Sequence, residues 1–402
     1  MIPLFFALEN NNAKQRFIKG YLFGIVFFSG VLYWLFNVSI PGAAGLVLML
    51  SVAPAIFSYL CLSAKRYPLY IIIYAPSAWV LSEYLRAHIF TGFPWALLGY
   101  SQSANIPLIQ FANITGVYGV SFLIVLVNAG LYLALRKSAH RFYILFFIFI
   151  LIAVCLIYGQ RMIKRVYPEQ ALTVSVIQGN IPQGIKWDPK YRDFIMDKYK
   201  RITKNAIAKG KPHLVIWPEA ALPGYMEDKG LSAQICDLAS SEKVYLLTGT
   251  LHGEGLSAFN SACLISNSGE VLDRYDKIHL VPLGEFLPLE NGFSWLRSCI
   301  NKPMGDFIRG KDYRVFSLKA EKSLLPISFS CFICYEDIFP ELSRRFVKNG
   351  ARFLVNVTND DWFGKTSAPY QHLQGSIFRA VENNVPVLRA ANTGVSGIFQ
   401  RV

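Results

Sequence analysis

Three short segments in the second half of the chain end in side chains that could carry out acyl transfer together. W-P-E ends at Glu219, R-Y-D-K ends at Lys277, and I-C-Y-E-D carries Cys334. They supply a carboxylate, an ammonium group and a thiol. Glu219 could take the thiol proton, Cys334 could attack a carbonyl carbon, and Lys277 could stabilise the resulting oxyanion. The three residue types together predict acyl transfer through a thioester.

Each of these residues stands at an end of a short run that predicts a β-strand. Glu219 comes after the run at residues 213–217 and Pro218, which cannot donate a hydrogen bond to a sheet. Cys334 closes the run at residues 325–334 and precedes a predicted helix, whose amino terminus would favour the thiolate. Taken singly, a solvated Glu, a surface Lys and a buried Cys are the commoner explanations. Because α/β enzymes place their chemistry at strand ends, the three together favour a catalytic site.

From residue 161 to residue 402, β-branched runs alternate with helical segments that have charged faces. We predict strands at residues 172–178, 213–217, 244–249, 258–266, 270–275, 325–334, 353–358 and 385–391. We predict helices at residues 191–208, 231–241, 338–348 and 372–383. Ser268 and Gly269 form a predicted hairpin turn, so part of the sheet is antiparallel. The pattern favours a layered α/β domain, with a loop at residues 282–310 over its site.

The first 160 residues differ in composition from the rest of the chain. They hold nine of the 40 Lys and Arg residues and two of the 26 acidic residues. Five apolar runs lie here, at residues 20–38, 42–62, 69–85, 115–135 and 142–159. About 20 helical residues cross the hydrocarbon core of a bilayer, so these lengths fit membrane-spanning helices. We therefore predict a transmembrane domain of about five helices at residues 1–160 and a water-soluble domain at residues 161–402.

The basic residues of the first domain fall on one side of the predicted spans. All but Arg86 lie before the first span, between the second and third, or between the fourth and fifth: Lys14, Arg16, Lys19, Lys65, Arg66, Arg136, Lys137 and Arg141. Loops that are rich in Lys and Arg stay in the cytoplasm. The amino terminus is therefore expected inside the cell. An odd number of spans then leaves residues 161–402 on the outer side of the cell membrane.

Cys331 and Cys334 form a C-x-x-C pair, a spacing that occurs in redox sites and in zinc sites. In a strand, however, residues three apart point to opposite faces, and the chain has no second C-x-x-C or H-x-x-x-H pair. We therefore expect neither a metal site nor a cofactor.

The segments around the three residues resemble those of the nitrilase superfamily. W-P-E, Y-D-K and C-Y-E are similar to its Glu-Lys-Cys triad, and its fold is an αββα sandwich. Other segments resemble a membrane-bound branch, the apolipoprotein N-acyltransferase family: S-E-Y-L-R, T-G-F-P-W-A-L-L-G-Y-S-Q, Q-G-N-I-P-Q-G-I-K-W-D-P, H-L-V-P-L-G-E-F-L-P-L-E, N-D-D-W-F-G-K and P-Y-Q-H-L-Q. The resemblance runs from about Phe17 to the last residue. It implies an α-helical membrane bundle joined to a nitrilase-like α/β domain.

The resemblance also implies an acyl transfer in two halves. An acyl chain would pass from a membrane phospholipid, typically phosphatidylethanolamine, to Cys334, and a lysophospholipid would leave. The α-amino group of the diacylglyceryl-cysteine that begins an apolipoprotein would then accept the chain. Glu285 matches a supporting carboxylate, and Trp187 matches an aromatic residue near the acyl site. Tyr335 and Glu336 match residues that flank the nucleophile.

Location and partners follow from the same resemblance. The protein is expected in the inner membrane of a bacterium, as a multi-pass protein with its catalytic domain on the periplasmic side. Its partners would be a phospholipid donor and an apolipoprotein acceptor. A formal net charge of +14 suits contact with anionic lipid, and no nucleic-acid partner is expected.

The chain departs from the family pattern at both ends. Family members begin with two more helices, of which Ile2–Leu8 would be a remnant, and they continue beyond Val402 with further strands and a final helix. We therefore expect a sandwich that lacks its last strands. Three interpretations follow: acyl transfer to an apolipoprotein, which we favour; a membrane-anchored amidase of the nitrilase type that passes the acyl group to water; and a shortened, inactive remnant.

Overall fold

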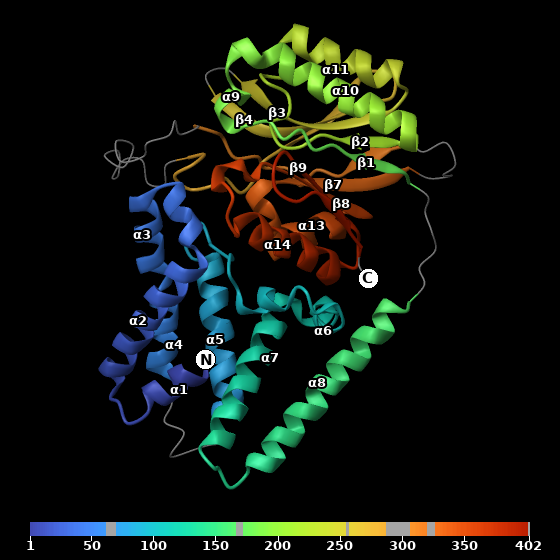
Figure 1. The fold of residues 1–402 in the computed structure, drawn as a ribbon. Coiled ribbons are helices and arrows are strands. Elements are labelled where there is room, and N and C mark those ends of the chain that lie inside the picture. The colour runs from blue at the N-terminus through green and yellow to red at the C-terminus, as the bar shows by residue number, and fades with distance from the viewer. Residues whose placement is uncertain (62–69, 166–171, 255–256, 287–305, 320–325, 401–402) are drawn as a thin grey trace. The chain divides into compact units, whose positions relative to one another are not determined.

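The computed structural model describes the chain except for residues 62–69, 166–171, 255–256, 287–305, 320–325 and 401–402 (Figure 1). The chain divides into two compact units, Met1–Val166 and Tyr167–Arg401. Most of the loop predicted at residues 282–310 lies outside the described residues.

Among the described residues of the first unit, the regular elements are all helices. Its α-helices are α1 (Ile2–Leu8), α2 (Ala13–Val31), α3 (Ile40–Leu50), α4 (Val52–Leu60), α5 (Tyr70–His88), α6 (Ile106–Ile109), α7 (Ala112–Leu135) and α8 (Arg141–Ile163). Two short 3₁₀ helices join them, η1 (Tyr33–Asn37) and η2 (Leu98–Gln102). Among the described residues, three stretches are long and apolar enough to cross a membrane: Ile40–Leu60, Ala112–Leu135 and Arg141–Ile163. Helices α2 and α5, of 19 residues each, overlap the other two predicted spans.

Helix α2 begins earlier than the apolar run in the sequence suggests. Its first turn is closed by a capping box, in which the Asn12 side chain accepts from the Gln15 backbone N–H at 2.9 Å. The Gln15 side chain accepts in return from the Asn12 backbone N–H at 3.1 Å. These two bonds satisfy amide groups that would otherwise be free at a helix start. The polar turn at residues 13–19 is therefore helical although it is not part of the apolar run.

Small residues let the helices of the first unit pack closely. On α2, Gly20 and Gly24 face α4, where a Cβ at Gly20 would lie 2.5 Å from the Pro54 carbonyl oxygen. A Cβ at Gly24 would lie 2.7 Å from the Ser51 Cα. This spacing of two glycines four residues apart is typical of close helix contacts in membranes.

Arg86 fixes the polar loop that follows α5. Its guanidinium donates to the carbonyl oxygens of Phe93 and Trp95 at 2.7 and 2.8 Å, and to that of Ala96 at 3.0 Å. On the same helix Glu83 accepts from the Leu98 backbone N–H at 2.7 Å. These bonds order the segment T-G-F-P-W-A-L, because three of its carbonyl groups find a side-chain donor in Arg86.

The second unit contains two five-stranded sheets. The first has the order β1 (Val174–Val176), β2 (Leu214–Ile216), β3 (Tyr245–Glu254), β4 (Ser257–Ile265) and β5 (Val271–Asp276). The second has the order β10 (Gly397–Phe399), β9 (Val387–Ala391), β8 (Phe353–Thr358), β7 (Ile327–Ile333) and β6 (Phe316–Leu318). In each sheet three neighbouring strands are parallel: β1, β2 and β3 in the first, and β7, β8 and β9 in the second. The remaining pairs are antiparallel.

Helices cover the outer face of each sheet, which confirms the predicted αββα sandwich. Helices α10 (Arg192–Gly210) and α11 (Lys229–Ser241) lie on the first sheet, and α13 (Pro340–Lys348) and α14 (Ala368–Asn383) lie on the second (Figure 1). Strand β4 contacts β7, so the inner faces of the two sheets meet. Apolar side chains of α10 and α11, such as Met196, Tyr199 and Ile235, pack with Trp217 in one buried core.

The strands of both sheets end beside residues of chemical interest. Glu219 comes three residues after the end of β2, Lys277 directly after β5, and Cys334 directly after β7. The predicted hairpin turn joins β4 to β5, and Gly269 adopts a φ of 86° there, a conformation that favours glycine. The short edge strands β6 and β10 are additions to the predicted set.

Candidate active site

Glu219 lies at the edge of the first sheet, in the turn that follows the carboxyl end of β2. Trp217 and Pro218 lead the chain off β2, and only 8% of Glu219 is exposed. The turn passes over Gly249 on β3, where a Cβ would lie 2.5 Å from the Pro218 carbonyl oxygen and 2.6 Å from the Glu219 Cα. A side chain at Gly249 would therefore displace Glu219. The carboxylate accepts a hydrogen bond from the Asn260 side-chain amide at 2.9 Å.

Lys277 is buried between two carboxylates. Its Nζ donates to Glu285 Oε1 at 2.9 Å and lies 3.9 Å from Glu219 Oε1, while 1% of the residue is exposed. Asn260 donates to Glu285 as well, at 3.0 Å, so one amide spans both acids. Burial alone would lower the pKa of Lys277, but Glu285, Cys334, Glu219 and Glu336 raise it further than burial lowers it. The ammonium group therefore keeps its charge at any physiological pH.

Cys334 begins the 3₁₀ helix η5 (Cys334–Ile338) in a left-handed backbone conformation, with φ of 53°. Such a conformation costs energy for a residue with a Cβ and occurs where surrounding structure enforces it. Here the Cys334 carbonyl oxygen accepts from the Asn356 side-chain amide at 3.2 Å and lies 3.2 Å from His372 Nε2. These contacts fix the backbone of Cys334 through its carbonyl oxygen.

The protonation state of Cys334 differs from the expectation that a helix terminus favours the thiolate. Burial raises the pKa of the thiol, and the charge of Glu219 raises it further. Lys277 and a hydrogen bond with the Thr358 side chain act in the opposite direction without overcoming these effects. The five-residue 3₁₀ helix provides too few aligned peptide groups to offset desolvation. The resting side chain is therefore a thiol, which needs a base before it can attack.

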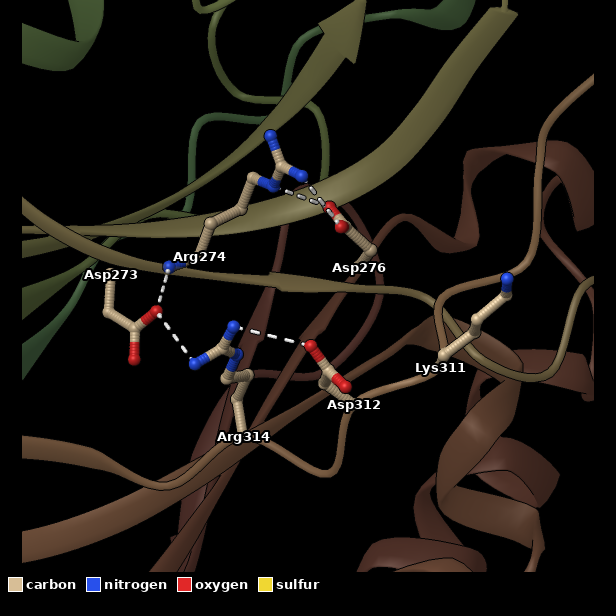
Figure 2. Close-up of a pocket in the computed structure, with 6 residues that line it drawn as sticks. All are labelled: Asp273, Arg274, Asp276, Lys311, Asp312 and Arg314. Atoms are coloured by element: carbon tan, nitrogen blue, oxygen red, sulfur yellow. Dashed lines mark hydrogen bonds and ion pairs between the residues drawn. The ribbon is translucent and has the colours of Figure 1, made fainter. Parts of the chain in front are cut away.

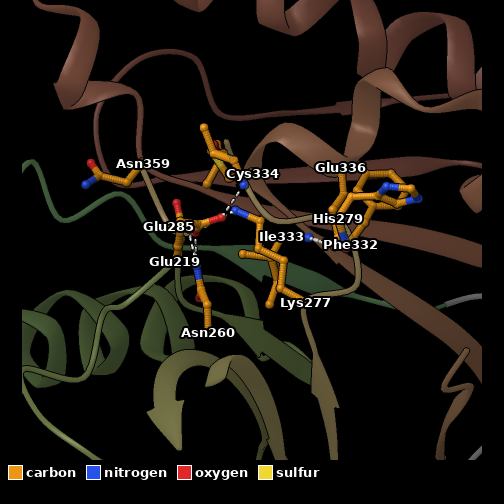
Figure 3. A network of polar contacts seen from close by, with 12 residues as sticks. Glu219, Asn260, Lys277, His279, Glu285, Phe332, Ile333, Cys334, Glu336 and Asn359 are labelled. Carbon is orange, nitrogen blue, oxygen red and sulfur yellow. Dashed lines mark hydrogen bonds and ion pairs between the residues drawn. The ribbon is translucent and has the colours of Figure 1, made fainter. Parts of the chain in front are cut away.

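The structure brings the three predicted residues into one cluster. Figure 3 shows Glu219, Lys277, Glu285 and Cys334 gathered where the two sheets meet. The charges of Glu219 and Lys277 both act on the Cys334 thiol. A carboxylate, a retained ammonium group and a protonated thiol are the set that base-assisted attack on a carbonyl requires.

Glu336 joins the segments that carry Lys277 and Cys334. It is fully buried, and its Oε1 accepts from the backbone N–H groups of Ile278 at 2.7 Å and His279 at 2.9 Å. Its Oε2 accepts from the Ile333 N–H at 2.8 Å, and the Tyr275 hydroxyl donates to the same carboxyl at 2.8 Å. Burial raises the pKa of Glu336 to about 7. One carboxyl group thus ties the end of β5 to the end of β7.

The other two predicted site residues take different positions. Tyr335 is 7% exposed and meets the Phe339 ring edge-on, with ring centroids 5.2 Å apart. Trp187 directly follows the short helix α9 (Gln183–Lys186) and is 44% exposed. Its side chain is therefore accessible to an apolar ligand. Cys331 is fully buried and has a free thiol.

A buried cluster of four charged side chains lies behind Cys334. Arg389 donates to Asp337 at 2.9 Å and to Asp360 at 3.0 Å, and His372 contacts the same two carboxylates at 2.9 and 2.8 Å. Burial and Arg389 lower the pKa of His372, but Asp337 and Asp360 raise it more, to about 9. Below that pH the cluster holds two positive and two negative charges. Its hydrogen bond to the Cys334 carbonyl oxygen comes from His372.

Sequence reasoning did not assign Asn260, Lys186 or this cluster to the site. His372 lies in P-Y-Q-H-L-Q, which contributed only to the resemblance. Arg389 lies inside a predicted strand. A charged residue in the middle of an apolar strand is the signal that could have identified it, because a buried charge needs partners of opposite charge.

Replacing Arg389 with Met should destabilise the second unit strongly. The change leaves two fully buried carboxylates without their guanidinium partner, and breaking a buried pair costs roughly 3–5 kcal/mol. Thermal unfolding of the purified protein in detergent would measure the loss. Arg352→Met, at an exposed position beside β8, is the matched control. Equal stability of the two variants would contradict the structural role of the cluster.

A pocket elsewhere on the second unit is lined entirely by charged residues. Figure 2 shows Asp273, Arg274, Asp276, Lys311, Asp312 and Arg314 around it. Arg274 pairs with Asp276 at 2.9 Å, and Arg314 pairs with Asp312 at 3.2 Å. Arg314 also lies 3.8 Å from Asp273, so five of the six side chains form ion pairs with one another. Among the residues that the structure describes, no group of three or more His, Cys, Asp or Glu residues is arranged to hold a metal ion.

Comparison with known proteins places the chain in a family. The model of the apolipoprotein N-acyltransferase N-terminal domain matches residues 1–130, and the carbon-nitrogen hydrolase model matches residues 173–401. An apolipoprotein N-acyltransferase of Geobacter metallireducens is 39% identical over 419 residues, covering 99% of this chain and 79% of that protein. The chain belongs to the apolipoprotein N-acyltransferase family. A relative of the same name from Methylococcus capsulatus is 34% identical and covers 98% of this chain and 79% of its own length.

Solved structures of the nitrilase superfamily are also similar to the chain. An amidase from Nesterenkonia AN1 covers 58% of this chain and 81% of its own, at 21% identity and a TM-score of 0.40. The protein Nit3 of Saccharomyces cerevisiae covers 55% of this chain and 75% of its own, at 17% identity and a TM-score of 0.41. Family membership makes this protein an acyltransferase of the nitrilase superfamily. The hydrolase match covers the entire cluster of Glu219, Lys277 and Cys334.

Proposed function

We propose that the protein moves an acyl chain from a membrane phospholipid, through a thioester on Cys334, to the amino-terminal diacylglyceryl-cysteine of apolipoproteins. The observation that supports this best is the cluster in which Lys277 lies between Glu219 and Glu285 beside the Cys334 thiol. Helices of membrane-spanning length in the same chain suit a lipid substrate. The relatives are named apolipoprotein N-acyltransferases, and we take the apolipoprotein as the acceptor from these names.

In the first half-reaction, Glu219 takes the proton of the Cys334 thiol while the sulfur attacks the ester carbonyl of the phospholipid. The developing oxyanion is stabilised by the Lys277 ammonium group, whose own proton is retained. When the tetrahedral intermediate collapses, the bond from the carbonyl carbon to the glycerol oxygen breaks. Glu219 returns its proton to that oxygen, and a lysophospholipid leaves.

In the second half-reaction, the α-amino group of the lipoprotein attacks the thioester carbonyl. Glu219 takes a proton from the amine, and the bond between carbon and sulfur breaks. The proton then passes to the departing Cys334 sulfur, which restores the resting thiol. An amide forms, and no oxidant, metal or cofactor is consumed. Glu285 and Asn260 keep Lys277 and Glu219 in place through both halves.

Trp187, Tyr335 and Glu336 have supporting roles in this proposal. The exposed ring of Trp187 would contact the acyl chain. Tyr335 and Glu336 fix the turn that presents Cys334, and Glu336 does so through backbone hydrogen bonds. The distribution of basic residues in the first 160 residues supports a location of the second unit on the periplasmic side of a bacterial inner membrane.

The test is acyl transfer by the purified full chain in detergent. Phosphatidylethanolamine with a radioactive acyl chain should label the protein, hydroxylamine should remove the label, and a diacylated lipopeptide should receive it. Release of the label as free fatty acid even with lipopeptide present would favour an amidase-like enzyme that uses water as acceptor. Folded protein that acquires no label would contradict the proposal and favour the inactive remnant.

A further inference from the structure

Lys186 is a buried cation that the reaction above does not use. It is the last residue of α9, and 3% of it is exposed. Its Nζ donates to the backbone carbonyl oxygen of Glu219 at 2.9 Å. Burying an ammonium group is costly, so a protein retains one where its charge or its hydrogen bonds have a use. Trp187, the next residue, is exposed, so the two side chains leave this turn in different directions.

Helix α9 and the residues just before it are hydrogen-bonded to the loops that follow strands β8 and β9 of the second sheet. The Gln183 backbone N–H donates to Asp361 at 2.7 Å, and the Asn359 side chain donates to the Gln183 side chain at 2.8 Å. Just before α9, the Ile181 N–H donates to the Asn392 side chain at 3.0 Å. Lys186 therefore extends from a helix fixed on the second sheet to the loop that carries Glu219 on the first. Lys186 therefore connects the loop that carries Glu219 with the second sheet, whose strand β7 leads to Cys334.

The charges around Lys186 belong to the same site. Glu219 follows β2, Asp361 lies in the 3₁₀ helix η6 (Asp360–Phe363), and Cys334 begins η5; these are the ionisable groups whose charges act on it. Glu219 and Glu285 together carry one negative charge more than Lys277 compensates. A second ammonium group beside Glu219 offsets this excess and favours the ionised carboxylate, the form that can accept a proton.

We propose that Lys186 is a positioning residue for Glu219, which it holds through the backbone carbonyl while its charge keeps the carboxylate ready to accept the Cys334 proton. The inference deepens the proposed function, on which it rests. Lys186 does not touch the reacting atoms. Its contribution is to the placement and the ionisation of the base.

Titration of Lys186 gives this role a pH signature. Burial lowers the pKa of Lys186, and Glu219, Asp361 and Cys334 raise it only in part, so the group titrates at about 8. The charged form is the active one, and raising the pH through about 8 should therefore slow thioester formation. Lys277 keeps its proton and Cys334 keeps its thiol over this range, because the pKa of each is raised.

Three variants separate positioning from mere structural support. Lys186→Met keeps the length of the side chain but removes charge and donor, and a misplaced base should slow thioester formation about 100-fold at pH near 7. The rate of this variant should no longer fall near pH 8. Lys186→Arg keeps charge and donors to much higher pH, so it should restore most of the rate and move the fall upward. Lys190→Met, on the exposed surface four residues later, is the control and should match the wild type.

The measurement is the initial rate of hydroxylamine-sensitive labelling across this pH range, with detergent gel filtration to check folding. A wild-type rate in Lys186→Met would overturn the proposal. A slow Lys186→Met that still loses activity near pH 8 would also overturn it, because the titration would then belong to another group.

Alkylation of Cys334 by iodoacetamide, followed by mass spectrometry of its peptide, needs no phospholipid. Lys186→Met should slow this alkylation, because removal of a nearby positive charge disfavours the thiolate, and unchanged alkylation would count against the charge effect. Wild-type protein that is alkylated but forms no thioester would refute the proposed function. The comparison of the two Lys186 variants by alkylation would remain valid in that case.

Discussion

Replacing Cys334 with Ala should abolish hydroxylamine-sensitive acylation of the protein and all transfer to a lipopeptide. In the proposed mechanism the Cys334 sulfur is the atom that bonds to the acyl carbon, so no thioester can form at this position without it. The variant should fold normally, since the thiol that it removes is uncharged and the bonds that fix the Cys334 backbone are made by its carbonyl oxygen. Labelling with radioactive phospholipid and measuring the counts before and after hydroxylamine treatment tests this.

Cys331→Ala is the matched control, because it removes a sulfur three residues before Cys334, in the strand β7 that leads to it. Cys331 is fully buried, and burial raises the pKa of its thiol well above the ordinary value. It should therefore contribute packing and no chemistry, and the control should label like the wild type. Label that persists in Cys334→Ala and disappears in Cys331→Ala would move the nucleophile to the other thiol.

Replacing Lys277 with Met should slow thioester formation by at least about 10³-fold while leaving membrane insertion intact. Loss of one oxyanion donor alone costs roughly 10²–10³ in rate. A second effect adds to it, because Glu219 and Glu285 then face each other without the cation between them. Their mutual repulsion is then no longer offset, which disturbs the position of the base.

In Lys277→Met, the amount of protein in the membrane fraction should therefore match the wild type, while the rate of acyl-enzyme formation should fall. Lys311→Met is a suitable control, because this exposed lysine lines the charged pocket away from the thiol (Figure 2). Undiminished acyl-enzyme in Lys277→Met would contradict the oxyanion role. Loss of the protein from the membrane fraction would show that the residue supports folding instead.

The sequence pattern predicted a layered α/β domain and the candidate triad because both have local signals, whereas the sandwich arrangement came from the family resemblance. Long β-branched runs marked the inner strands, and each triad residue directly follows or closely follows such a run. Strands β6 and β10 were missed because three residues at a sheet edge are too few to show a period. The start of α2 was missed because its capping box is polar and lies outside the apolar run.

The parts of the site that sequence reasoning missed depend on long-range pairing. Lys186 looks like a surface lysine until the fold places it beside Glu219, 33 residues later in the chain. Asp337 and Arg389 are separated by 52 positions, and each reads as an ordinary polar residue without the other. Burial depends on tertiary structure, and the pKa of the Cys334 thiol follows burial more than the adjacent helix. For this reason the adjacent helix does not lower the pKa of the thiol, contrary to the expectation from the sequence, and Cys334 still needs the base that the sequence predicted for it.

The carboxyl group of Glu336 has a consequence for protein engineering. The amide hydrogens of Ile278, His279 and Ile333 all converge on it from two different sheets. Grafting only the three candidate catalytic side chains onto another scaffold would omit the carboxyl group that joins the segments of Lys277 and Cys334. A transplant would have to carry this acid and its surrounding amides as one module, whereas the distal ends of the sheets could be redesigned freely.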